Sequence, residues 1–229
     1  MKRYSLFLLF LAASPTAAQD IALSQILSEG QDWRLVSKDN KSEWEFAETL
    51  RKAAHPTVDA ANGFHYYIDE DTRTVVSTRQ EKKILHMDHH RVDGTKNPAG
   101  ITLWPDGRTL VIGDAEGKHL WSYRVEKNGS LTCGDRYYAL RVKPGQTASG
   151  VTALTVDARG LLYACTPLGV QIFDPTGRMC GVLLPAAAAN PTAIAFGGPD
   201  RDLLYVQHGE AVYVRKTQAK GVAPVEKKQ

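Results

Sequence analysis

Apolar and polar residues alternate in short runs along most of this chain, and tight-turn residues separate the runs. Residues 98–114, PAGITLWPDGRTLVIGD, show the pattern: an apolar run, a Pro-Asp-Gly turn, and a second apolar run. Alternation with a period of two, bounded by Pro, Asp and Gly, predicts two antiparallel strands joined by a turn. We therefore expect a protein built mainly from short β-hairpins.

A similar phrase occurs four times. Its copies cover residues 55–69, 98–114, 151–166 and 191–208. The turn glycines of the first three copies recur at intervals of roughly 40 to 50 residues, the length of one propeller blade. Each phrase would provide the two inner strands of a blade, and the apolar segments that follow would provide the outer two. The sequence thus predicts an all-β fold, a β-propeller of four-stranded antiparallel blades with four countable repeats.

The fourth repeat is one strand short. Only residues 211–216, AVYVRK, follow its inner pair before a charged C-terminal segment. Residues 33–37, WRLVS, precede all four repeats and have strand composition. We expect this strand to complete the fourth blade, because pairing the two ends of the chain leaves few exposed edges. A four-bladed closure is known among propellers, and an incomplete ring completed by a second copy is the alternative.

Two features lie before the first repeat. Residues 1–18 join Lys2 and Arg3 to an apolar run that ends in small residues, the pattern of a secretory signal peptide, and the run is too short to span a bilayer. Residues 21–28 and 45–54 have apolar side chains at helical spacing, so we expect one or two short helices that cover an edge or end of the propeller. The expected organisation is a signal peptide (1–18), a propeller domain (19–215) and a disordered charged tail (216–229).

Composition and charge exclude some classes of protein. The chain has 229 residues, of which 43% are hydrophobic and 23% charged, as in one globular domain with a sizeable core. Its formal net charge of +3 includes Lys2 and Arg3 of the signal peptide, and no segment carries a basic stripe, so a nucleic-acid partner is excluded. No later segment is long and apolar enough to span a membrane. We expect an exported protein, periplasmic or secreted, whose oligomeric state stays open.

The cysteines and histidines indicate no metal or redox centre. Cys165 and Cys180 fall two strands apart in the expected blade, a separation of over about 9 Å, so we predict that they are not bonded. The third cysteine is Cys133. Residues 86–90, HMDHH, offer three imidazoles and a carboxylate, but they fall on the outer strand and turn of the first blade without a fixed metal-ligand spacing. We expect a solvated loop there, and its role stays open.

Several acidic residues also have ordinary structural explanations. Glu43, Glu45 and Glu48 are expected on a solvated helix face before the first blade. Asp106 and Asp157 lie in predicted turns, where a carboxylate bonds the backbone amides that follow it.

Three longer runs resemble a known family. They are residues 98–131, 151–185 and 191–206, which include the phrases FDPTGR and AFGGPD in the family's order. Together with WRLV near residue 33, they resemble the gluconolactonase, senescence-marker-protein and luciferin-regenerating-enzyme family over residues 33–215. The resemblance implies a propeller, usually of six blades, that hydrolyses sugar lactones and holds one divalent cation, Ca²⁺ or Zn²⁺, in its central channel.

The resemblance also implies metal-ligand positions, and this chain lacks the expected ligands there. The family's glutamate, asparagine and aspartate correspond to Ala54, Ala99 and Thr152, and the related position of the fourth repeat is Ala193. A methyl group donates nothing to a hard cation, and a neutral hydroxyl is a weak ligand. We therefore expect no metal and no other cofactor, with these four residues lining the channel.

Three functional hypotheses follow. The first is an exported propeller, a pseudoenzyme, that has lost its metal and serves as a non-catalytic binding or scaffold module for a small carbohydrate or lactone-like ligand. The second is an active metal-dependent lactonase or esterase that hydrolyses a sugar lactone with a relocated ligand set, His55 being the candidate base beside the acidic residues of 43–48. An unrelated propeller that acts as an interaction platform is a third. No nucleophile elbow, zinc-protease motif or nucleotide-binding loop occurs, so other enzyme chemistry has no support.

Overall fold

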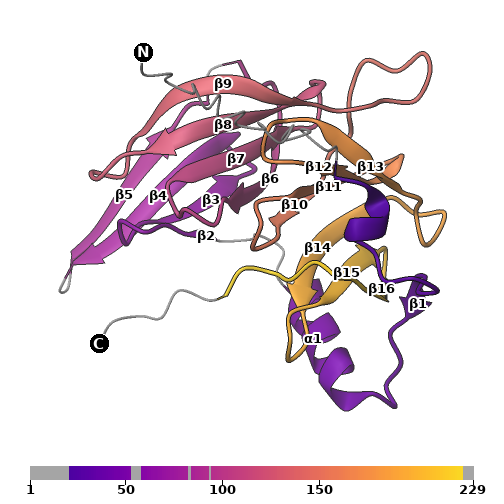
Figure 1. Cartoon of the computed structure of the whole chain (residues 1–229). Coiled ribbons are helices and arrows are strands. Elements are labelled where there is room, and N and C mark those ends of the chain that lie inside the picture. Colours follow the sequence, from indigo (N-terminus) through magenta and orange to yellow (C-terminus); the bar gives the residue numbers. More distant parts are fainter. Residues whose placement is uncertain (1–20, 53–57, 82–83, 93, 224–229) are drawn as a thin grey trace, which may run out of the picture.

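The computed structural model describes residues 21–52, 58–81, 84–92 and 94–223, and it is a four-bladed β-propeller (Figure 1). Each blade is an antiparallel sheet of four strands. Blade 1 contains β2 (Val58–Asp59), β3 (His65–Asp69), β4 (Thr74–Glu81) and β5 (Ile84–His90). Blade 2 contains β6 (Pro98–Leu103), β7 (Thr109–Asp114), β8 (His119–Val125) and β9 (Leu131–Ala139). Blade 3 contains β10 (Ala153–Val156), β11 (Leu162–Thr166), β12 (Gly169–Phe173) and β13 (Met179–Leu183).

Blade 4 is completed by the N-terminal strand, as the sequence predicted. It contains β14 (Pro191–Gly197), β15 (Leu203–His208) and β16 (Ala211–Lys216), and β1 (Arg34–Leu35) pairs with β16. Arg34 lies opposite Val214 and Leu35 opposite Tyr213. The predicted fold class is therefore confirmed, both in the number of blades and in the strand that closes the last one.

The repeated turns explain why each phrase forms a hairpin. In blade 2, the Asp106 carboxylate accepts hydrogen bonds from the backbone amides of Arg108 (2.8 Å) and Thr109 (3.0 Å), while Gly107 takes a positive φ of 64°. In blade 3, Asp157 accepts from the amides of Arg159 and Leu161, both at 2.9 Å. An aspartate therefore organises the turn in blades 2 and 3, and glycine tolerates the left-handed conformation without the strain that a side chain would add.

Four hydrophobic clusters hold the molecule together. One lies between blades 1 and 2, one between blades 2 and 3, and one between blades 3 and 4. The fourth joins blade 4 to α1 (Lys41–Lys52), and it includes Ala47 and Leu50 of the helix with Tyr205 and Val214 of the sheet. Among the described residues, no such cluster joins blade 4 to blade 1. Blades 1, 2 and 3 each pack one face on the next blade. In blade 4 the helix α1 covers the corresponding face.

Both predicted N-terminal helices differ from expectation in their bounds. Within residues 21–28 only a short 3₁₀ turn, η1 (Leu23–Gln25), is present. The helix expected at 45–54 begins earlier, at Lys41, because Asn40 precedes it and its side-chain oxygen accepts a hydrogen bond from the Glu43 amide at 3.4 Å. Phe46 of α1 packs on Tyr205 with ring centroids 4.5 Å apart. The helix thus covers one end of the propeller, as proposed from the sequence.

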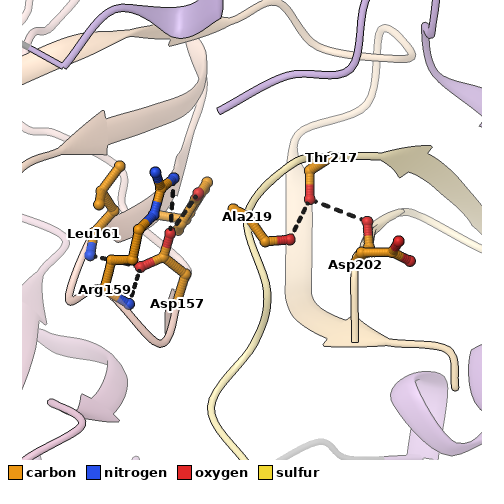
Figure 2. Close-up of polar contacts among 7 residues, drawn as sticks. Asp157, Arg159, Leu161, Asp202, Thr217 and Ala219 are labelled. Carbon is orange, nitrogen blue, oxygen red and sulfur yellow. Dashed lines mark hydrogen bonds and ion pairs between the residues drawn. The ribbon is translucent and has the colours of Figure 1, made fainter. Parts of the chain in front are cut away.

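The sequence analysis placed the start of the disordered tail at residue 216, which is too early. Residues 217–221 follow β16 and pack on the propeller: Thr217 and Ala219 are buried, and Gly221 forms a bridge with Asp157. Figure 2 shows the Thr217 hydroxyl between the carbonyl oxygens of Asp202 (3.0 Å) and Ala219 (2.8 Å). Buried polar contacts of this kind need a fixed backbone, so the packed chain extends at least to Gly221 rather than ending at 215.

The close approach of Gly221 to the blade 3 turn also bears on Asp157. This carboxylate is fully buried, and burial raises its pKa, although the amides of Leu161 and Arg159 and the Arg159 guanidinium act in the opposite direction. The Arg159 guanidinium lies 3.6 Å from it. Figure 2 marks this ion pair with a dashed line. The turn and the C-terminal segment are joined by backbone contacts, among them the hydrogen bond from the Ala158 amide to the Lys220 carbonyl oxygen at 2.7 Å.

Other expectations concern the cysteines and the N-terminus. No disulfide joins Cys133, Cys165 or Cys180, which confirms the prediction from strand spacing that Cys165 and Cys180 are not bonded to each other. The predicted signal peptide, residues 1–18, lies outside the described residues. None of the described helices has the length and apolar character needed to cross a bilayer.

Candidate functional site

A central pocket of about 600 Å³ lies where the inner strands meet. Three blades contribute consecutive residues to its wall, namely 97–101 leading into β6, 152–154 at β10 and 192–195 on β14. Leu50 of α1 and the blade 1 residues Ile68, Glu70 and Arg73 complete the described lining. Figure 1 shows β6, β10 and β14 gathered at the centre of the four sheets. The propeller therefore brings together residues that lie far apart in the sequence.

Three of the four predicted channel residues line this pocket. They are Ala99, Thr152 and Ala193, one from each of blades 2, 3 and 4. Ala54 and His55 fall within residues 53–57, which lie outside the described residues. The position expected for a catalytic base is therefore not described.

Close backbone packing holds the inner strands in place. A Cβ atom on Gly100 would lie 2.9 Å from the Ala153 Cα, and one on Gly113 would lie 2.1 Å from the Ala99 carbonyl oxygen. Real Cβ contacts are longer, so both positions need glycine. Gly100 also has a positive φ of 74°. The wall of the pocket between blades 2 and 3 is thus built from closely packed backbone.

Asp114, at the end of β7, orients the segment that enters β6. It is buried, and its carboxylate accepts hydrogen bonds from the backbone amides of Asn97 (3.0 Å) and Lys96 (3.2 Å). The Glu116 amide donates to it at 3.2 Å. Asp114 therefore fixes the approach of Asn97 and Ala99 to the pocket. No local sequence signal points to this longer-range role.

The donor chemistry of the pocket does not fit a divalent cation. Thr152 donates its hydroxyl to the Pro191 carbonyl oxygen at 2.6 Å, and Ala99 and Ala193 offer only methyl groups. Glu70 is the one carboxylate in the described lining. A hard cation needs several oxygen ligands converging at one point. In the part of the chain that the structure describes, no group of three or more His, Cys, Asp and Glu residues is placed to hold a metal ion.

The charges around the pocket balance each other. Arg73 and Glu70 both line it, and the Arg73 guanidinium also lies 3.8 Å from the Glu116 carboxylate. The Arg73 and Glu116 side chains are both solvent-exposed, so the ion pair between them adds little to stability. The site has no net charge concentrated on it.

Unpaired backbone edges supply further polar groups. β6, β10 and β14 are each terminal in their sheets, so one edge of each strand has no neighbouring strand. Every second residue on a free edge directs its amide and carbonyl away from the sheet. A ligand in the pocket can therefore find hydrogen-bond donors and acceptors even where the side chains are aliphatic.

Glu43, Glu45 and Glu48 of α1 were expected on a solvated helix face, and for Glu43 that expectation is wrong. Glu43 is buried rather than solvated, and both of its carboxylate oxygens accept hydrogen bonds from the Arg34 guanidinium, one of them at 2.7 Å. This hydrogen bonding raises the pKa of Arg34. The pair joins α1 to β1, because the buried Glu43 carboxylate would be unstable without a positively charged partner. Glu45 and Glu48 remain near solvent, with Lys41 and Arg51 as their partners.

The histidine segment lies within β5, the outer strand of blade 1 where the sequence placed it, but it is a paired strand and not the solvated loop that we expected. His90 Nε2 lies 2.7 Å from the Ser77 hydroxyl, and His89 Nδ1 lies 3.2 Å from the Thr74 hydroxyl. Burial lowers the pKa of His90. These contacts tie β5 to β4 and are structural.

Two other hollows of similar size lie away from the inner strands. One, of about 700 Å³, lies beside the Ala61–Asn62 turn and β8, and the other, of about 710 Å³, lies beside Trp33 and β13. Neither collects residues from three blades. The central pocket remains the best candidate site because ligand sites in propellers form where strands from several blades converge.

The sequence comparisons agree with this architecture. Residues 56–209 match the family model described as the SMP-30/Gluconolactonase/LRE-like region. A gluconolactonase of Zymomonas mobilis subsp. mobilis is 25% identical over 125 residues, which cover 53% of this chain and 33% of that protein. The chain thus spans about one third of the length of this curated relative.

Solved structures show the same fold. A gluconolactonase of Xanthomonas campestris aligns with a TM-score of 0.55 and 15% identity, over 70% of this chain and 56% of that one. Regucalcin of Agrobacterium tumefaciens, titled a calcium-binding protein, aligns with a TM-score of 0.55 and 18% identity, over 72% and 61%. A luciferin-regenerating enzyme aligns with a TM-score of 0.58 and 16% identity, over 76% and 64%. In each case the chain spans less than two thirds of the matched structure.

Proposed function

The chain belongs to the SMP-30/gluconolactonase/LRE-like family, and from that premise we propose that it is a non-catalytic member, a binding module for a small carbohydrate or lactone-like ligand. The proposal places the ligand in the central pocket. We further propose that the chain is exported to the periplasm or secreted, on the strength of the signal-peptide pattern in residues 1–18.

One observation supports this function above the others. The pocket has the size and position of a ligand site, yet Ala99 and Thr152 stand where the resemblance implies cation ligands. Hydrolysis of a lactone by this family's chemistry depends on a cation that polarises the ester carbonyl and orients water. A pocket that keeps its shape without those ligands is suited to binding and lacks the means for that reaction.

The competing hypothesis, an active lactonase with a relocated ligand set, has less support. It would draw on the acidic residues of 43–48, but Glu43 is engaged by Arg34 and lies in the contact between α1 and β1. Glu70 alone supplies a carboxylate to the described lining. A single carboxylate does not make a hard-cation site.

Metal analysis combined with a hydrolysis assay tests the proposal. The purified mature protein is expected to contain no stoichiometric Ca²⁺ or Zn²⁺ and to show no turnover of D-glucono-1,5-lactone above the spontaneous rate, with or without a chelator. Chelator-sensitive turnover would establish the lactonase hypothesis instead.

A variant that restores the implied ligands provides the matched control. Ala54→Glu, Ala99→Asn and Thr152→Asp together rebuild the ligand types that the resemblance implies. We expect this triple variant to bind Ca²⁺ at least tenfold more tightly than the wild-type chain in calorimetric titrations. Equal binding by the two proteins would show that the three positions do not decide metal binding.

A further inference from the structure

The chain contains two Asn-Gly pairs, Asn62-Gly63 and Asn128-Gly129, and each lies in a hairpin turn of the same form. The Gly63 amide donates to the Ala60 carbonyl oxygen at 3.0 Å. The Gly129 amide donates to the Glu126 carbonyl oxygen, also at 3.0 Å. Both glycines have a positive φ, 81° and 87°. The two turns therefore match in their backbone, and the contacts of the asparagine side chains distinguish them.

An asparagine followed by glycine can modify itself, because no side chain shields the glycine nitrogen. This nitrogen attacks the asparagine Cγ and a new carbon–nitrogen bond forms. The bond from Cγ to Nδ2 breaks, and Nδ2 leaves as ammonia with the proton that the glycine nitrogen gives up. Water then opens the resulting succinimide ring to aspartate or isoaspartate. Isoaspartate carries the main chain through Cγ, which makes the main chain one atom longer.

The contacts of Asn128 favour this reaction. Asn128 is exposed, and its Oδ1 accepts hydrogen bonds from the Ser130 hydroxyl at 2.8 Å and from the Ser130 amide at 3.1 Å. Negative charge develops on Oδ1 when Cγ is attacked, and two donors directed at that oxygen stabilise the charge, as in an oxyanion hole. The turn thus activates the side-chain amide that has to react.

The contacts of Asn62 oppose the same reaction. Asn62 is half-buried, and its Oδ1 accepts a hydrogen bond from the Phe64 amide at 3.0 Å without a neighbouring hydroxyl to add a second donor. Its Nδ2 donates to the Glu126 carbonyl oxygen of blade 2 at 2.6 Å, so the atom that has to leave as ammonia is held in place. We infer that Asn128 is a site of spontaneous deamidation to aspartate and isoaspartate, and that blade 2 protects Asn62.

The turn at Asn128 forms part of the contact between blades 1 and 2. The buried Tyr66 hydroxyl of blade 1 donates to the Gly129 carbonyl oxygen at 2.8 Å. Gly129 also lies against the Phe64 ring, because a Cβ atom on Gly129 would be 2.5 Å from the ring atom Cε1. An extra main-chain atom at residue 128 displaces this carbonyl and leaves a buried hydroxyl without its acceptor, which is costly. Isoaspartate therefore weakens the contact between the blades, whereas aspartate leaves the main chain unchanged.

Peptide mapping by mass spectrometry tests the inference on the full mature chain, aged in a mildly alkaline buffer. We expect Asn128 to deamidate at least fivefold faster than Asn62. The same chain unfolded in urea is the control, and there the two rates should agree within about twofold, because the side-chain contacts are lost. Equal rates in the folded protein, or a faster reaction at Asn62, would overturn the inference. An unchanged ratio in urea would show that these contacts do not decide it.

A variant tests the role of the Ser130 hydroxyl. Ser130→Ala removes this donor and keeps the backbone amide, so Asn128 should deamidate at least twofold more slowly. Asn62 serves as the internal standard, and its rate should not change. An undiminished rate at Asn128 would overturn the activation by Ser130.

Thermal melting tests the consequence for the blades. Asn128→Asp represents the aspartate product and should melt at the wild-type temperature. The isoaspartate form, isolated from the aged protein by chromatography, should melt at a lower temperature. In Tyr66→Phe, which lacks the buried hydroxyl, the difference between the two forms should shrink. Equal melting of the isoaspartate form and Asn128→Asp would overturn the effect on the contact between blades 1 and 2.

Discussion

The two ends of the blade series are finished in different ways. At blade 4, the helix α1 packs on the sheet, β1 adds its outer strand, and residues 217–221 pack alongside. At blade 1, the outer strand β5 carries Leu85 and Met87, which lie two residues apart on one face and are 61% and 50% exposed. The comparison shows that a propeller end can be covered by elements from outside the repeat, and that within the described part of the chain this happens at one end only.

The difference has a simple origin in the sequence order. The segment before the first repeat provides β1 and α1, and β1 must pair with β16 to complete blade 4. The short connection between them, residues 36–40, keeps α1 beside the same blade. Blade 1 follows α1 in the chain, and none of the described N-terminal elements, η1, β1 and α1, adds a strand to it. Four predictions test how much each end depends on its covering elements.

The largest effect is expected at the contact between α1 and blade 4. Leu50 is buried in that cluster, so Leu50→Ala should lower the free energy of unfolding by about 3 kcal/mol. Leu85→Ala is the matched change at blade 1, where the side chain is mostly exposed, and it should cost less than about 0.5 kcal/mol. Urea unfolding of both variants makes the comparison, and equal costs would show that α1 does not stabilise blade 4.

A smaller effect is expected at the ion pair that joins α1 to β1. Glu43→Gln leaves the Arg34 guanidinium without its carboxylate, and we expect a loss of about 1 to 2 kcal/mol, since Arg34 is half-exposed. Glu45→Gln on the exposed face of the same helix should change stability by less than about 0.5 kcal/mol. Similar losses in the two variants would assign the effect to helix charge rather than to the buried pair.

The C-terminal segment should contribute about as much as one good hydrogen bond. Thr217→Val removes the buried hydroxyl that faces the Asp202 and Ala219 carbonyls, and it should cost about 1 kcal/mol. Amide hydrogen exchange should then be faster at residues 217–221. Thr147→Val, at an exposed loop position, is the control. Unchanged exchange at residues 217–221 would mean that the hydroxyl does not hold this segment.

The smallest effect concerns pH at blade 1. Burial lowers the pKa of His90, so the unfolded chain binds a proton near pH 6.5 while the folded protein does so only at lower pH. Between these two values the unfolded state holds more protons, and stability therefore falls as the pH drops below about 6.5. We expect a His90 titration midpoint below 6.5 by NMR and a weaker pH dependence of unfolding in His90→Gln. If the unfolding free energy of His90→Gln depended on pH as strongly as that of the wild type, His90 would not be the group that lowers stability in acid.

Much of the fold could be predicted because its signals are local. The phrase around Asp106 and Gly107 contains both strands and the turn that joins them, so neighbouring residues suffice to predict the hairpin. Strand composition and count also predicted the pairing of β1 with β16. The helix at Lys41 was placed a few residues late, because its signal is the capping residue Asn40 rather than the apolar spacing.

The candidate site was predictable only in part. The sequence pointed to Ala99, Thr152 and Ala193 through a resemblance, and the structure places all three on one pocket. Leu50 and Ile68 carry no sequence signal for that pocket, since an apolar residue on a helix or strand looks the same whether it faces a core or a ligand site. Asp114 acts through backbone amides some 17 residues away, which no local pattern reveals.

The sequence alone determined the blades, their turns and the absence of the implied cation ligands from Ala54, Ala99 and Thr152, because those properties belong to single residues and their near neighbours. Only the tertiary structure decided that α1 covers blade 4, that Glu43 is buried against Arg34, and that residues from several blades and the helix line one pocket. These contacts join residues distant in the chain, and they depend on how twisted sheets pack against each other, which local patterns do not specify.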